Sequence, residues 1–192
     1  MTTQRLAAIA VAALLASCGG GNPLSNPDPV QNPPGAGGQK LSFRYFQKCI
    51  NVIFDTPLQV NQGGVISTNT CGSGGCHDTS TGTGGALRVV QHTTEVDLAT
   101  TTVDVARTTD MYKNFYSSQG ATVIGSPAES RLLAKPLLTV LHGGGQIFAS
   151  AADDNAKRIA FWISRPMPQG QDEFSEAGNS MLDSATGACL TQ

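Results

Sequence analysis

Apolar residues recur three and four positions apart in several parts of the chain, a pattern typical of helices that bury one face. The first such segment covers residues 41–54, and its apolar face consists of Phe43, Phe46, Ile50, Ile53 and Phe54. Ser42 is placed to cap the start of the helix, and Pro57 follows its end. We therefore predict an amphipathic helix over this segment.

Two later segments have the same spacing. Residues 108–118 have Gly120 near their end and offer four side chains for burial, Met111, Tyr112, Phe115 and Tyr116. Residues 153–166 end at a proline, and their apolar stripe consists of Ile159, Trp162 and Ile163. Each segment predicts one further helix.

A shorter helix is predicted from Ser126 to Pro136. Ser126 can cap its start, Pro127 suits the first helical position, and Glu129 completes a capping box.

Long stretches between these helices lack a helical pattern. Residues 62–85 are rich in Gly, Thr and Ser and predict a loop, whereas residues 86–90 suggest a short strand. The tail, residues 167–192, is polar and is expected to be irregular. The predicted fold class is therefore mainly α, a small helical domain with long Gly-rich loops.

The N-terminus has the pattern of a targeting segment. Arg5 precedes an apolar stretch, residues 6–16, of the length found in secretory signals. The run Leu15-Ala16-Ser17-Cys18 resembles the lipobox of bacterial lipoproteins. That resemblance implies a signal peptide over residues 1–17 and lipidation of Cys18, and Gly19 in place of aspartate favours the outer membrane. The other interpretation is an ordinary signal peptide with a chance cysteine.

Residues 18–39 predict a flexible linker between the lipid and the domain. This segment is rich in glycine and proline and has too little apolar surface to fold alone. The folded domain is therefore expected over residues 40–192.

Composition and charge exclude several classes of protein. The net charge is −2 and Lys and Arg do not cluster, which argues against nucleic acid as a partner. No apolar run is long enough for a membrane-spanning helix, and no heptads persist. A small, glycine-rich domain with a modest core needs help from disulfides, a metal or a cofactor.

The cysteines supply candidate chemistry. The chain has five, of which Cys71 and Cys76 lie close together and are followed directly by His77. Two cysteines and an adjacent histidine are typical of covalent haem attachment, in which the thiols bond to the haem and the imidazole binds iron. Here four residues separate the cysteines instead of two. Two other interpretations are a local disulfide between Cys71 and Cys76 and a zinc site with one further ligand.

Several segments together resemble the small c-type cytochrome domains of exported bacterial lipoproteins, including the planctomycete type. The resemblance spans residues 43–170 and is carried by the first helix, Cys76-His77, the runs 83–87 and 125–133, His142-Gly143-Gly144-Gly145, and the end of the last helix. It implies one covalently bound haem c in a membrane-anchored electron carrier that is not an enzyme. Other redox proteins would be its partners.

Candidates for the second iron ligand follow from that assignment. His142 lies in a Gly-rich loop before the last helix, where the distal ligand of small cytochromes c is found. Met167 is the runner-up, and His92 and Met111 are minor candidates.

Cys49 and Cys189 then form the leftover pair. We expect a disulfide between them, since free thiols are uncommon in exported proteins. The alternative to an electron carrier is a disulfide-stabilised lipoprotein that serves as a binding or structural module without haem.

Overall fold

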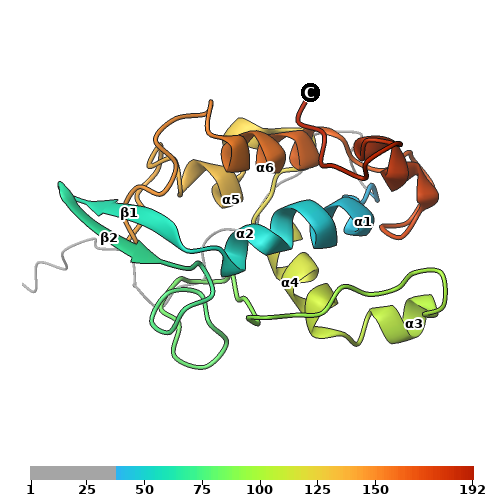
Figure 1. The fold of residues 1–192 in the computed structure, drawn as a ribbon, viewed down its shortest axis with the longest axis horizontal. Coiled ribbons are helices and arrows are strands. Elements are labelled where there is room, and N and C mark those ends of the chain that lie inside the picture. The colour runs from blue at the N-terminus through green and yellow to red at the C-terminus, as the bar shows by residue number, and fades with distance from the viewer. Residues whose placement is uncertain (1–37) are drawn as a thin grey trace, which may run out of the picture.

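The computed structural model describes residues 38–192. The predicted signal peptide, Cys18 and nearly all of the predicted linker lie outside the described residues. The elements, shown in Figure 1, are α1 (Phe43–Tyr45), a π-helical turn (Phe46–Ile50), α2 (Asn51–Asp55), β1 (Leu58–Gln62), β2 (Val65–Asn69), α3 (Val103–Ala106), α4 (Asp110–Gln119), a 3₁₀ turn (Pro127–Glu129), α5 (Arg131–Ala134), α6 (Asp154–Ser164) and a second 3₁₀ segment (Glu176–Met181). Among these described helices, none has the length and apolar character needed to cross a membrane.

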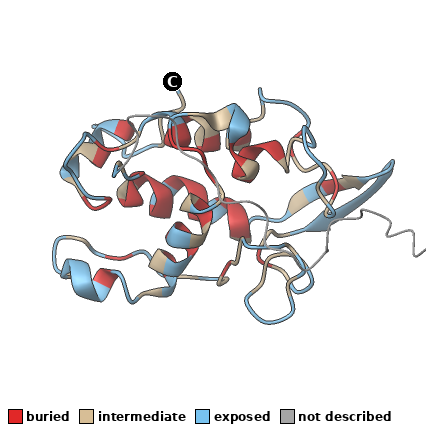
Figure 2. Cartoon of the chain, turned by 180° about the vertical axis from the view of Figure 1, so that it is seen from behind, coloured by how far each residue is buried: buried red, intermediate tan, exposed pale blue. Residues whose placement is uncertain are grey.

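The first predicted helix is confirmed and lies at the centre of the molecule. α1, the π-helical turn and α2 follow one another without a break over residues 43–55, and we call this stretch the central helix. Ser42 caps it, because its hydroxyl accepts a hydrogen bond from the amide of Tyr45 at 3.1 Å. Figure 2 shows buried residues concentrated along this helix and along the helices beside it.

Aromatic side chains join the central helix to α4 and α6. The ring of Phe46 lies 5.4 Å from the rings of both Phe115 on α4 and Trp162 on α6, and all three are buried. The indole nitrogen of Trp162 also donates a hydrogen bond to the carbonyl of Ser42 at 2.9 Å. This contact satisfies the polar end of the indole in the core.

The helices predicted near residues 108–118 and 153–166 are confirmed as α4 and α6. Their caps are Thr109, which accepts from the amide of Tyr112, and Asp153, which accepts from the amides of Asn155 and Ala156.

The single helix predicted from Ser126 to Pro136 is wrong in its detail. The chain forms a 3₁₀ turn, leaves the helical conformation at Ser130, and then forms α5. The Ser130 hydroxyl donates to the carbonyl of Ser126 and accepts from the amide of Val123. Such side-chain bonds compete with helical backbone bonds, so the predicted capping box does not form.

The prediction of a mainly α fold class is also wrong. The structure is mixed, with six short α-helices and a two-stranded antiparallel sheet, and most of the described chain lies outside both. The sheet falls in a stretch that we expected to be partly loop. Gly63 and Gly64 form its two-residue turn with φ of 60° and 94°, a conformation that glycine adopts without strain and that suits hairpins.

The strand suggested for residues 86–90 does not form, and only a single bridge joins Asp78 and Val89. Polar side chains of α4, and not a neighbouring strand, form hydrogen bonds with the backbone of this segment. Asn114 accepts from the amide of Val90 and donates to its carbonyl, and Ser117 accepts from the amide of Arg88.

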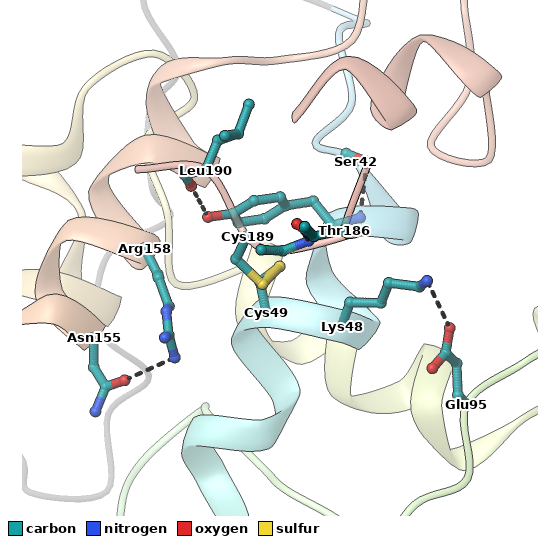
Figure 3. Close-up of a disulfide and its surroundings, with 11 residues drawn as sticks. Ser42, Lys48, Cys49, Glu95, Asn155, Arg158, Thr186, Cys189 and Leu190 are labelled. Atoms are coloured by element: carbon teal, nitrogen blue, oxygen red, sulfur yellow. Dashed lines mark hydrogen bonds and ion pairs between the residues drawn. A yellow bond between two sulfur atoms is a disulfide. The ribbon is translucent and has the colours of Figure 1, made fainter. Parts of the chain in front are cut away.

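The C-terminal tail is more ordered than the sequence predicted. It contains the second 3₁₀ segment, and the structure has the expected disulfide between Cys49 and Cys189 (Figure 3). The Tyr45 hydroxyl donates to the carbonyl of Leu190, the residue after Cys189. The disulfide links positions 140 residues apart, and loss of a native disulfide from a small domain costs about 2–5 kcal/mol of unfolding free energy.

A buried carboxylate, that of Glu173, joins the C-terminal tail to α4 and to the residue after α3. Glu173 is 3% exposed, and its Oε1 accepts a hydrogen bond from the Tyr112 hydroxyl at 2.7 Å and one from Arg107. Burial raises the pKa of Glu173, but hydrogen bonds from its own amide, Tyr112 and Arg107 outweigh this and hold the pKa below its usual value. The carboxylate is therefore ionised at neutral pH.

We expect Glu173→Gln to lower the free energy of unfolding at pH 7 by about 1–2 kcal/mol, because a charged acceptor is lost. Arg107 is half exposed, so water screens its share of the effect. A depressed folded-state pKa stabilises the protein above the unfolded pKa, about 4.3, and this contribution disappears as the pH falls through the folded value. Urea unfolding at several pH values measures it.

Glu176→Gln is the matched control, since Glu176 is exposed in the same segment and carries the same charge. Equal losses in the two variants, or a difference that does not shrink in acid, would contradict the assigned role of Glu173.

Candidate functional site

The candidate site is a cavity of about 1290 Å³. Its walls come from the end of α2, the β1–β2 hairpin, the loop over residues 69–88, α5 and the loop over residues 140–148. Cys71, Cys76, His77 and His142 all line it, so the four residues predicted to bind haem lie around one space.

Two tight turns bring the cysteines and His77 together. The amide of Cys76 donates to the carbonyl of Ser73 and the amide of His77 donates to the carbonyl of Cys71, both at 3.0 Å. Gly75 has a φ of 83°, which lets the chain reverse between the two cysteines. The four-residue spacing therefore still places both thiols and the imidazole on one cavity.

Both thiols are free in the structure, and the local disulfide considered above does not form. Burial, helped by the nearby Cys76 and Asp55 and opposed by a backbone hydrogen bond, raises the pKa of the Cys71 thiol to about 12. Cys71 is therefore a protonated thiol at neutral pH. Cys76 accepts a weak hydrogen bond from the Asn69 side chain at 3.5 Å.

A hydrogen bond at one ring nitrogen fixes the orientation of the His77 ring. Its Nδ1 lies 3.1 Å from the carbonyl oxygen of Leu87. Burial lowers the pKa of His77, despite the hydrogen bond to Leu87, so the ring is neutral at pH 7. Because a carbonyl oxygen only accepts, the proton is on Nδ1 and Nε2 keeps its lone pair. This is the arrangement found in histidines that bind metals.

His142 is held in the same way. Its Nδ1 lies 2.7 Å from the carbonyl oxygen of Gly145. Burial lowers the pKa of His142, against the effect of that hydrogen bond, and the charge of Lys135 lowers it further. His142 is thus a second neutral imidazole with an unprotonated Nε2.

The two imidazoles line the same cavity and lie close to one another. Their ring centres are 6.2 Å apart and their planes differ by 18°. Metal–nitrogen bonds are about 2.0 Å long, so this separation is compatible with a metal ion that both rings would hold.

The other candidates for an iron ligand lie elsewhere. Met167 is 2% exposed and packs in the core, and its amide donates to the carbonyl of Lys40. Met111 is also buried, and its sulfur accepts from the Thr93 hydroxyl. His92 is exposed and lines a separate hollow. Of the four candidates, only His142 shares the cavity with His77.

Two features of the site were missed at the level of sequence. Three basic side chains line the cavity, Arg88, Arg131 and Lys135, together with one acidic residue, Glu129. Glu129, Arg131 and Lys135 lie within seven residues of one another, but Arg88 is 41 residues away from Glu129, and nothing in the sequence joins Arg88 to the other three. Gly84 packs directly on the His77 ring, since a Cβ at this position would lie 2.2 Å from Nδ1. Its signal was the glycine-rich run 83–87, which was noted without a role.

We expect Gly84→Ala to displace the His77 ring and to cost about 1–3 kcal/mol of unfolding free energy, the range for overpacking. Gly74→Ala is the control in the same loop, because its Cβ would meet only the Thr81 hydroxyl, at 3.7 Å. Urea unfolding compares the two variants. Equal stability would mean that the close packing of Gly84 on His77 is not maintained in solution.

The arrangement can supply two thiols for covalent attachment and two imidazole nitrogens for one metal ion. Within residues 38–192, no three His, Cys, Asp or Glu side chains are grouped to hold a metal by themselves. Comparisons of the chain with protein-family models, curated proteins and solved structures found no match.

Proposed function

We propose that this protein is an electron carrier in which Cys71 and Cys76 attach one haem covalently and His77 and His142 bind its iron. The observation that carries the proposal is the pair of neutral imidazoles, 6.2 Å apart, on the cavity that both free thiols line. When bound, haem would supply a one-electron couple, and His77 and His142 would hold its iron.

The size and walls of the cavity suit a large planar group. Its volume of about 1290 Å³ exceeds the roughly 300–1,000 Å³ of ordinary ligand pockets. Leu141 and Tyr116 line it although they are 88% and 68% exposed. A bound porphyrin would cover apolar surface of this kind, which adds stability at about 25 cal/mol per Å².

The chain's own residues favour electron transfer over catalysis at the metal. His77 and His142, each fixed through Nδ1 by a backbone carbonyl, would both bind the iron and would compete with exogenous ligands for it. The charge of Lys135 acts on both histidines. Because the oxidised state of a metal carries one more positive charge, a nearby ammonium group favours the reduced state.

The proposal includes a membrane anchor. The lipobox-like run before Cys18 and the Gly/Pro-rich residues 18–39 support a domain tethered to lipid, with the outer membrane favoured. The partners would be other redox proteins, met while the domain moves on its tether.

A second candidate function is a binding or structural lipoprotein without haem. The observation that favours it is the Cys49–Cys189 disulfide, a covalent link between the C-terminal tail and the buried core that does not involve the cavity.

Expression with a c-type haem maturation system separates the two. We expect one haem adduct in the intact mass, which Cys76→Ser abolishes, and a low-spin spectrum. His142→Ala should open the sixth position, shift the spectrum toward high spin and let the reduced protein bind carbon monoxide. His92→Ala, the control at an exposed histidine, should leave the spectrum unchanged. A mature protein without a haem adduct would contradict the electron-carrier proposal and leave the haem-free binding or structural function.

The anchor predicts that the protein fractionates with membranes and that Cys18→Ala releases it or leaves it unprocessed. A single acyl chain binds membranes only marginally, so stable association requires more than one. Partition and migration identical to those of the parent protein would exclude lipidation of Cys18.

A further inference from the structure

The loop that carries His142 is held by the hairpin. Three hydrogen bonds join them: the amides of Asn61 and Gln146 each donate to the other's carbonyl at 2.9 Å, and the Gln62 side chain donates to the carbonyl of Gly143 at 2.8 Å. Figure 1 shows the hairpin extending away from the helices at one end of the molecule. The loop therefore takes part of its support from an element that stands apart from the core.

The contact is close as well as hydrogen-bonded. Gly145 has a φ of 81°, and a Cβ at this position would lie 2.5 Å from the carbonyl oxygen of Asn61. The carbonyl of the same glycine accepts from Nδ1 of His142. One residue thus contacts β1 on one side and fixes the imidazole on the other.

The loop has little support of its own. Leu141, next to His142, is 88% exposed, and Val140 is 45% exposed. Gly143, Gly144 and Gly145 follow the histidine, and glycine loses more backbone entropy on ordering than any other residue. Such a segment opens easily unless another part of the chain holds it.

We propose that the hairpin positions the second iron ligand, with Gln62 as the positioning residue that keeps His142 in place. This inference rests on the proposed haem function. The bond from Gln62 crosses 81 positions of sequence and ends one residue after His142. Losing it shifts the loop toward an open state in which His142 leaves the metal.

The carbon monoxide association rate of the reduced haem protein reports this opening, because the gas binds only when His142 is away. Gln62→Ala should raise the rate about 2- to 10-fold, the factor for one ordinary hydrogen bond. Gln62→Glu, which keeps the shape but loses the donor, should do the same, and Gln62→Lys, which restores a donor, should return the rate toward that of the parent.

Gln59→Ala is the matched control. Gln59 is exposed on the same strand, and its side chain makes no hydrogen bond to the described residues. A second readout needs no haem: hydrogen exchange of the Gly145 and Gln146 amides in protein made without maturation should speed up in Gln62→Ala and not in Gln59→Ala.

The outcomes separate this inference from the proposed function. Haem-loaded protein with the same rate in Gln62→Ala and the parent, or with equal increases in Gln59→Ala and Gln62→Ala, overturns the positioning role alone. Absence of haem overturns the proposed function and the ligand role of His142. The exchange measurement then still decides whether Gln62 holds the loop: unchanged exchange overturns that contact, and faster exchange supports it.

Discussion

Burial of the central helix is the interaction on which the rest of the structure depends. Between residues 43 and 55 only Lys48 and Val52 are exposed, so this helix is surrounded on nearly every side. Its C-terminal end forms one wall of the candidate site, where Ile53 and Phe54 line the cavity. The carbonyl of Phe54 also accepts from the amide of Gly72, which fixes the loop of Cys71 and Cys76 to the core.

The cavity thus has two walls of different stability. On one side, the loop of Cys71 and His77 is tied to the central helix and, through Asn114 and Ser117, to α4. On the other, His142 lies in a loop supported by the hairpin. Opening a segment is easier where fewer buried contacts hold it. The His142 side is therefore the one through which a large planar group would enter or a ligand would leave.

The sequence predicted the elements that depend on local apolar spacing. The central helix, α4 and α6 each bury a stripe at helical intervals, and that stripe is visible in the sequence. The hairpin could have been predicted from Gly63-Gly64, a recognised turn signal, because apolar and polar residues alternate at the start of the run before it and the run after it contains the β-branched residues Val65, Ile66 and Thr68. The path of residues 86–90 could not, because its backbone is satisfied by Asn114 and Ser117, polar side chains on a distant helix.

The candidate site also combines features that have a local sequence signal with features that depend on distant residues. Cys71, Cys76 and His77 are neighbours in the sequence, so their chemistry was apparent at once, whereas His142 was placed by its order along the chain. The contact between Gln62 and Gly143 has no local signal, because nothing in either sequence indicates the other. The two histidines are nevertheless held in the same way, because the Nδ1 atom of each is hydrogen-bonded to a backbone carbonyl. Under the proposed function, this contact would orient each ring and keep its Nε2 free to bind the metal.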